Sequence, residues 1–218
     1  MKYNIVKLFL KTDDQILDNT SKIRGFIGNK FKEYNLLHNH YGNNYIFTYP
    51  KVQYKIVNGK ILILGINEGG EILKKISSNL NYLDLDKKYH ISEKIIHEKI
   101  FDIKPTIDAK HYKFVTPWIG LNTNNYQKFK RINNWRDKKI LLNKIIVGNI
   151  LSLSKGLGII VNKKLYAKSF LNEENIIYKS VKMNAFKGEF KIHYDLPDYI
   201  GIGKGVSHGF GCVKKLIK

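Results

Sequence analysis

The sequence has a single cysteine, Cys212, so it lacks the residues for an internal disulfide or a multi-cysteine zinc site. It also lacks a long apolar run: polar residues interrupt Ile140–Leu153, which falls short of the ~20 residues that a membrane-spanning helix needs. Met1–Leu10 carries Lys7 inside its apolar stretch, unlike a secretory signal. We therefore expect a cytoplasmic protein with no membrane partner.

Acidic residues are scarce, because 18 Asp and Glu face 38 Lys and Arg, for a formal net charge of +20. Basic residues run from Lys2 to Lys218 instead of gathering on one amphipathic helix, as an anionic-membrane binder would arrange them. The hydrophobic content of 43% is that of a globular protein. The composition favours nucleic acid as the partner of a folded chain.

Apolar spacing in the first half predicts most of a ferredoxin-like domain over residues 1–86. An alternation of apolar and polar residues predicts strands, and Asn58-Gly59 predicts a hairpin turn. The expected order is strand Lys2–Lys11, a helix capped at Thr12–Asp14 with apolar positions from Ile16 to Phe31, strands Tyr45–Val57 and Lys60–Ile66, and helix Glu68–Leu83.

The polar segment Leu83–Lys88 is expected to be a linker to a second domain, residues 89–218. There we expect strands Tyr89–Ile103 and His111–Leu121, helices Asn124–Arg131 and Lys138–Lys155, strands Gly158–Phe170 and Asn175–Tyr194, and a closing strand Phe210–Ile217. The predicted fold class is α+β, with two tandem ferredoxin-like (RRM-like) domains and a C-terminal glycine-rich loop.

Five glycines lie within Gly201–Gly211, just before the closing strand. Glycine tolerates positive φ and close backbone approach, so successive N–H groups there can form an anion-binding nest, to which Lys204 adds a positive charge. An ordinary glycine-rich turn is the alternative. The spacing matches neither a P-loop nor a dinucleotide-binding fingerprint.

Gly201-Ile202-Gly203, five further residues and then Gly209-Phe210-Gly211 resemble the C-terminal signature of the Cas6 (Cas-six) family of CRISPR repeat-RNA endoribonucleases. The resemblance implies two ferredoxin-like domains and a loop that contacts CRISPR precursor RNA. The RNA-binding residues implied in this loop are Gly201, Gly203, Lys204, Gly209 and Gly211. Related non-cleaving subunits carry similar loops, so a non-catalytic RNA-binding subunit of a CRISPR effector complex is the alternative function.

His38 and His40 are the only histidines that lie close together in the sequence, in a polar segment after the first predicted helix. The resemblance implies that the catalytic histidine lies in this region, and His-Asn-His is similar to the subtype I-B branch that includes methanogen members. Tyr45 is a third catalytic candidate by proximity alone, a status that it shares with Tyr34, Tyr41 and Lys51. A His-x-His metal site and a pair of solvated histidines are the alternatives.

Two imidazoles are sufficient for RNA cleavage without a metal or cofactor. The RNA supplies its own nucleophile, a 2′-hydroxyl, which one histidine can deprotonate while the other protonates the departing 5′-oxygen. The expected products are a 2′,3′-cyclic phosphate and a 5′-hydroxyl.

A basic and aromatic cluster over residues 126–131 provides a second candidate RNA contact. Lys128, Lys130 and Arg131 alternate there with aromatic residues, a mixture that grips phosphates and stacks bases. A solvated helix face with buried aromatics is an equal alternative. The resemblance further implies a homodimer on RNA and CRISPR effector subunits as partners.

Overall fold

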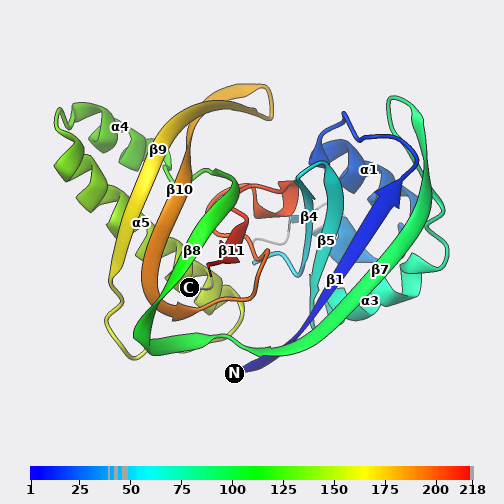
Figure 1. Ribbon diagram of the computed structural model, residues 1–218, viewed down its shortest axis with the longest axis horizontal. Coiled ribbons are helices and arrows are strands. Elements are labelled where there is room, and N and C mark those ends of the chain that lie inside the picture. The colour runs from blue at the N-terminus through cyan, green and yellow to red at the C-terminus, as the bar shows by residue number, and fades with distance from the viewer. Residues whose placement is uncertain (39, 42–43, 46–48, 217–218) are drawn as a thin grey trace. The chain divides into compact units, whose positions relative to one another are not determined.

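The computed structural model describes residues 1–38, 40–41, 44–45 and 49–216, of which His40, Tyr41, Asn44 and Tyr45 are described by their backbone. The chain forms two compact units (Figure 1). The first unit comprises Lys2–Asp102 together with Val206–Gly209. The second unit comprises Met1, Ile103–Gly205 and Phe210–Lys218. Each unit is built on an antiparallel sheet.

The first unit contains a sheet with the strand order β4-β5-β1-β7-β6, in which β1 pairs antiparallel with both β5 and β7. Its β-α-β-β-α-β order is ferredoxin-like. The elements are β1 (Lys2–Thr12), α1 (Thr20–Lys30), α2 (Asn35–His38), β2 (His40–Tyr41), β3 (Asn44–Tyr45), β4 (Val52–Val57), β5 (Lys60–Ile66), α3 (Glu68–Ser77), β6 (Tyr82–Asp84) and β7 (Lys88–Asp102).

Helices α1 and α3 pack on the same apolar cluster of the first sheet. Ile27 of α1 and Leu73 of α3 share this core with Leu8 of β1 and Ile63 of β5, and all four are fully buried. Because each such side chain contributes about 1.5–3 kcal/mol on burial, this core holds α1 firmly against the sheet.

The second unit contains a sheet with the order β11-β8-β10-β9, again a ferredoxin-like arrangement. Segment 196–212 replaces the second helix of that fold, and its short helix η1 (Val206–His208) belongs to the first unit. The elements are β8 (Lys104–Trp118), α4 (Thr123–Arg131), α5 (Trp135–Gly156), β9 (Ala167–Tyr178), β10 (Val181–Asp195) and β11 (Val213–Lys215).

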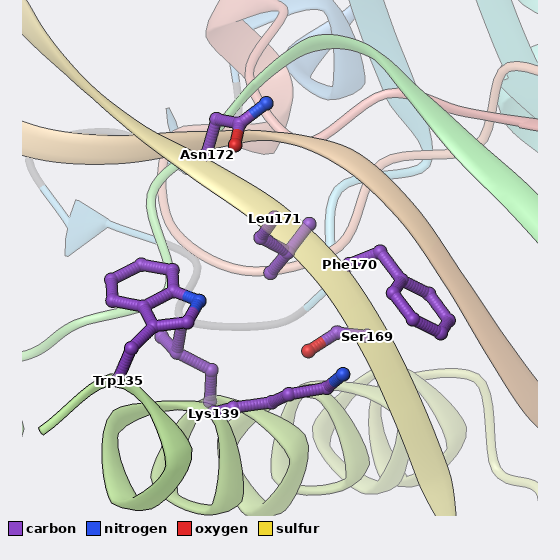
Figure 2. Close-up of a pocket in the computed structure, with 7 residues that line it drawn as sticks. Trp135, Lys139, Ser169, Phe170, Leu171 and Asn172 are labelled. Atoms are coloured by element: carbon purple, nitrogen blue, oxygen red, sulfur yellow. The ribbon is translucent and has the colours of Figure 1, made fainter.

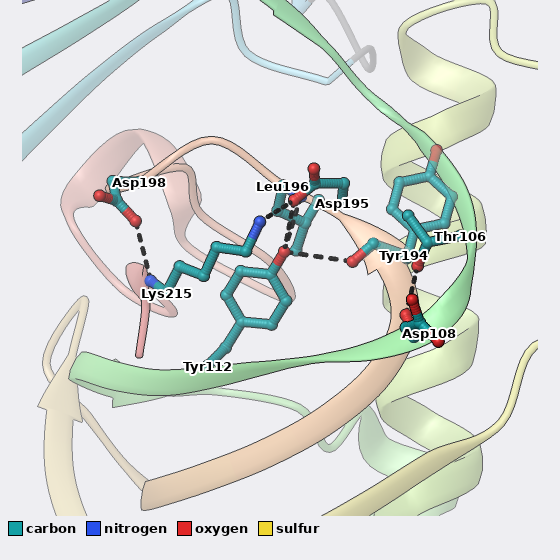
Figure 3. A network of polar contacts seen from close by, with 8 residues as sticks. All are labelled: Thr106, Asp108, Tyr112, Tyr194, Asp195, Leu196, Asp198 and Lys215. Atoms are coloured by element: carbon teal, nitrogen blue, oxygen red, sulfur yellow. Dashed lines mark hydrogen bonds and ion pairs between the residues drawn. The ribbon is translucent and has the colours of Figure 1, made fainter. Parts of the chain in front are cut away.

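A polar network fixes the start of segment 196–212 (Figure 3). The Tyr112 hydroxyl accepts a 2.8 Å hydrogen bond from the Leu196 N–H and lies 3.1 Å from the Tyr194 carbonyl oxygen. Lys215 of β11 forms a 2.7 Å ion pair with Asp195. Burial raises the pKa of Tyr112, so its hydroxyl stays protonated.

The α+β class with two ferredoxin-like units is as predicted, but the division between units lies at residues 102/103 instead of 86/89. Leu83–Lys88 is not a linker: β6 and β7 pair across it, with Asp84 opposite Lys88. Strand β7 then pairs with β1 and completes the first sheet. The polar character of the segment comes from a hairpin turn.

Several predicted boundaries are wrong. Helix α3 ends at Ser77 and not at Leu83, because Tyr82–Asp84 forms strand β6. The turn between the last two long strands lies at residues 179–180, since β9 continues through Tyr178. The first helix begins at Thr20 with Asn19 as its N-cap, not at Thr12–Asp14, because β1 continues through Thr12. The strand predicted from Gly158 begins only at Ala167. The closing strand is shorter than Phe210–Ile217, since β11 comprises Val213–Lys215 and Ile217 lies outside the described residues.

The hairpin turn at Asn58-Gly59 is confirmed, since φ is 51° at Asn58 and 73° at Gly59, as a type I′ turn requires. The strand predicted over Tyr45–Val57 is present from Val52, while residues 46–48 lie outside the described part of the chain. Within the described residues, no helix has the length and apolar character to cross a membrane.

Candidate active site

His38 is the last residue of α2, and its imidazole is half-buried against α1. The contact depends on Gly28: a methyl group on Gly28 would come within 2.6 Å of Cε1 of His38. Real Cβ atoms essentially never approach another atom so closely, so the ring occupies the space that glycine leaves open. Gly28 is itself buried in the interior of α1.

Two hydrogen bonds hold the backbone at the end of α2. The Tyr54 hydroxyl donates to the Leu37 carbonyl oxygen at 3.3 Å, and the Arg24 guanidinium donates to the His38 carbonyl oxygen. Burial raises the pKa of Tyr54, while the Arg24 charge opposes that rise. The phenol is therefore a neutral donor at ordinary pH.

His40 and Tyr45 are register partners across the short β2–β3 ladder, directly after α2. Their side chains lie outside the described residues. The backbone thus places two of the three predicted catalytic residues opposite one another, and His40 lies two residues beyond His38. Their catalytic roles stay predictions.

His208 of η1 lies against α1 within the first unit. Its Nδ1 atom is 2.9 Å from Oγ of Ser21, and its Nε2 atom is 2.8 Å from a guanidinium nitrogen of Arg24. Arg24 therefore contacts both His38 and His208. Sequence reasoning missed Arg24 and Gly28, although a glycine in a helix interior is a recognised sign of close packing.

Four of the five glycines in the glycine-rich loop have φ values that disfavour other residues, namely 90° at Gly203, 73° at Gly205, 89° at Gly209 and 63° at Gly211. A Cβ on Gly209 would lie 3.0 Å from the Tyr54 carbonyl oxygen, within the first unit. Gly201 is buried and forms an isolated bridge with Cys212.

Several backbone N–H groups of the loop donate hydrogen bonds to other parts of the protein, whereas the anion-binding nest requires N–H groups that face a ligand. Five loop N–H groups donate to protein carbonyl oxygens: those of Ile202, Lys204, Gly209, Phe210 and Gly211. The Lys204 side chain is exposed, with Nζ 5.8 Å from the Tyr178 ring centroid. Side chains such as Lys204, more than these five amides, are available to meet a phosphate.

Helix α4 presents Lys128, Lys130 and Arg131 to solvent, while Phe129 is buried between them. The Phe129 ring packs edge-on against Phe186 with centroids 5.5 Å apart. The buried aromatic residue anchors the helix, and the contact of the exposed cations with RNA stays a prediction.

A pocket of about 300 Å³ lies between α5 and β9 (Figure 2). Trp135 and Phe170 line it and are 46% and 53% exposed. The Lys139 ammonium lies 4.1 Å from the Phe170 ring centroid, and Ser169 is tied to Asn143 by a 2.7 Å hydrogen bond. Exposed rings beside a cation are suited to stacking an unpaired base.

Among residues 1–38 and 49–216, no group of three or more His, Cys, Asp or Glu side chains is placed to hold a metal ion.

Comparison with known proteins gives matches along the whole chain. The Cas6b N-terminal domain model matches residues 1–102, and the Cas6b C-terminal domain model matches residues 105–216. An uncharacterized protein of Methanocaldococcus jannaschii, MJ0978, is 48% identical over 103 residues, which are 47% of this chain and 69% of that protein.

Two solved structures are similar over nearly the full length. One, described as the crystal structure of Cas6b, has a TM-score of 0.89 and 32% identity over 99% of this chain and 100% of its own. The other, described as the CRISPR RNA processing endoribonuclease Cas6b, has a TM-score of 0.78 and 31% identity over the same shares. The two domain models and these two structures cover both units, and the chain belongs to the Cas6b family of CRISPR RNA endoribonucleases.

Proposed function

We propose that this protein is a metal-independent endoribonuclease that cleaves the repeats of CRISPR precursor RNA into guide RNAs. The observation that carries the proposal is the match, over 99% of the chain, to a structure named as a CRISPR RNA processing endoribonuclease. The paired histidines His38 and His40 lie in the first unit, where α1 supports the first of them.

One histidine accepts the proton of the 2′-hydroxyl upstream of the cleaved bond, and the 2′-oxygen attacks the neighbouring phosphorus. The other protonates the 5′-oxygen as the P–O bond breaks, leaving a 2′,3′-cyclic phosphate and a 5′-hydroxyl. Each proton transfer contributes about 10²–10⁴ in rate. Tyr45, the register partner of His40, is the third candidate and acts as a hydrogen-bond donor to the phosphate.

Precursor RNA is held by cations and exposed rings on both units in this proposal. The contacts are the Gly201–Gly211 loop with Lys204, the α4 cations Lys128, Lys130 and Arg131, and the stacking surface at Trp135 and Phe170. Gly201, Gly203, Gly209 and Gly211 serve by shaping the loop. A homodimer on the RNA and effector-complex partners in the cytoplasm stay predictions.

The test is single-turnover cleavage of end-labelled repeat RNA in EDTA, with His38→Ala, His40→Ala and Tyr45→Phe variants. We expect cleavage in EDTA, a cyclic phosphate end, and a loss of at least about 10²-fold in rate for one histidine variant while the Kd for RNA changes little. RNA with a 2′-deoxy sugar at the cleaved linkage is the matched substrate control and should bind without being cut.

Unchanged cleavage in both histidine variants would overturn the mechanism. Binding without any cleavage by the unaltered protein would instead support the non-catalytic effector subunit.

A further inference from the structure

Helix α1 carries a row of polar residues that touch η1 and α2. Thr20, Ser21, Arg24 and Gly28 follow helical spacing, so they share one side of α1. Thr20 and Ser21 contact His208, Gly28 contacts His38, and Arg24 contacts both histidines. A single helix face thus connects the C-terminal segment with the proposed catalytic histidine.

The contacts fix the protonation of His208. A guanidinium has N–H donors and no acceptor, so Nε2 of His208 accepts the 2.8 Å hydrogen bond from Arg24. The ring is then neutral with its proton on Nδ1, and that N–H donates to Oγ of Ser21 at 2.9 Å. Thr20 also donates to the His208 carbonyl oxygen.

The second terminal nitrogen of Arg24 donates to the His38 carbonyl oxygen. That carbonyl ends a four-residue helix, where the last carbonyl groups lack partners within the helix. A charged donor makes this hydrogen bond stronger than a neutral one. Arg24 therefore fixes the backbone of His38, and Gly28 makes room for its ring.

Close approach of η1 to α1 is built into the loop. Gly209 has a φ of 89°, and a Cβ there would lie 3.0 Å from Cγ2 of Thr20. Val206 at the other end of η1 is buried. His208 is therefore held at both sides in the position from which it orients Arg24.

We propose that Arg24 and His208 are positioning residues for the cleavage reaction: neutral His208 orients the Arg24 guanidinium, which holds His38 in its reactive position. The inference rests on the proposed function and extends it, because it gives the glycine-rich segment a role in catalysis besides RNA contact. Neither residue needs to touch the RNA for this role.

The test measures the single-turnover rate and the RNA Kd separately for Arg24→Gln, with Lys22→Gln as the matched control. Lys22 lies on the same helix and loses the same charge, but its partners are Asp18 and Asp86. We expect Arg24→Gln to lower the rate at saturating RNA by roughly 10- to 100-fold, because about 1 Å of misplacement can cost 10² in rate. Lys22→Gln should cleave at the normal rate.

Two variants at position 208 distinguish a role in orienting the Arg24 guanidinium from a purely structural role in holding η1 against α1. His208→Gln keeps an oxygen that can accept from Arg24, whereas His208→Ala keeps none. We expect the glutamine variant to retain most of the rate and the alanine variant to lose it, with RNA affinity unchanged in both. Arg24→Gln combined with His208→Ala should be no slower than Arg24→Gln alone, since both act through one contact.

Melting temperatures and ¹⁵N-histidine NMR complete the test. The unaltered protein should show His208 as the neutral tautomer protonated at Nδ1, and the His38 signals should shift in Arg24→Gln. Full rates in Arg24→Gln and His208→Ala, with His38→Ala inactive, would overturn this inference alone. A fully active His38→Ala variant would also overturn this inference, and the proposed function would fall with it only if His40→Ala were fully active as well. If Arg24→Gln does not fold, the pair at position 208 decides the question.

Discussion

Gly28 shows how a single residue can determine where a reactive group lies. Alanine is favoured over glycine in a helix by about 1 kcal/mol, so the exposed or open glycine positions of a helix gain stability on substitution. In α1, Gly25 has no atom within 4 Å of an added Cβ, whereas a Cβ on Gly28 would collide with the His38 ring. The two positions are therefore a matched pair.

We predict that Gly28→Ala lowers the single-turnover cleavage rate by about 10-fold or more, because the His38 ring must move. Gly25→Ala should leave cleavage unchanged and stabilise the protein by roughly 0.5–1 kcal/mol. Rate and unfolding free energy measured on both variants check this. Equal rates in the two variants would show that the position of the His38 ring does not matter for cleavage.

Tyr112 controls stability instead of chemistry. Replacing it with phenylalanine leaves the buried Leu196 N–H without its acceptor, so Tyr112→Phe should lose about 1–3 kcal/mol at neutral pH. Burial raises the pKa of the phenol, so in alkali the unfolded chain ionises at this residue first. The contribution of Tyr112 to the free energy of unfolding is full below about pH 10. Above that pH it declines by up to about 1.4 kcal/mol per pH unit.

Chemical denaturation between pH 8 and 11 measures this effect. The stability of Tyr112→Phe should fall less steeply above pH 10 than that of the unaltered protein. Tyr166→Phe is the control, because Tyr166 is 59% exposed and its replacement should leave the stability at neutral pH unchanged. Parallel curves for Tyr112→Phe and the unaltered protein would contradict the prediction.

At the scale of elements, local signals in the sequence predict some boundaries well and others poorly. Asn and Gly tolerate the positive φ values that the turn at Asn58-Gly59 requires, so these two residues are enough to predict the hairpin. The start of α1 cannot be predicted in this way. Thr12–Asp14 and Asn19 can all cap a helix N-terminus, and only the length of β1 decides between them. Ile16 is buried outside any helix, which extends the apparent helical spacing toward the N-terminus.

In the candidate site, too, the sequence predicts local features but not the contacts between residues far apart in the chain. Neighbouring histidines are visible in the sequence, but the contact of His208 with Arg24 joins residues 184 positions apart. No periodicity predicts such a contact, since it depends on segment 206–209 joining the first unit. The prediction of a linker at Leu83–Lys88 is wrong for a related reason, because a hairpin turn and a domain linker have similar polar composition.

Helix α4 allows a test of its proposed contact with RNA. For a single strand, each cation that binds a phosphate adds about 0.7 to the slope of log Kd against log salt. Replacing Lys128, Lys130 and Arg131 with glutamine should therefore lower the slope by about 2 if all three bind phosphates. The matched control replaces the exposed Lys60, Lys75 and Lys99 of the first unit, which changes the net charge equally. Equal slopes in the two triple variants would show that α4 contributes only to the overall charge.

For the whole molecule, the formal net charge of +20 acts on folding and on RNA binding in opposite directions. Like charges repel in the folded protein, and salt screens that repulsion over a distance of about 10 Å at 0.1 M. Salt also weakens attraction to RNA by competing at the phosphates. The free protein should therefore become more stable, and its RNA complex weaker, as salt rises.

We predict that raising NaCl from about 50 to 500 mM increases the Tm of the free protein by a few degrees, while the rise in Tm caused by RNA shrinks toward zero. Thermal melts with and without an uncleavable 2′-deoxy repeat analogue give both quantities in one series. Both triple-glutamine variants should show a smaller gain in Tm from salt than the unaltered protein, because less charge is left to screen. A Tm of the free protein that falls with salt would mean that its attractive ion pairs, such as those of Lys22 and Lys74, outweigh the repulsion among the remaining cations.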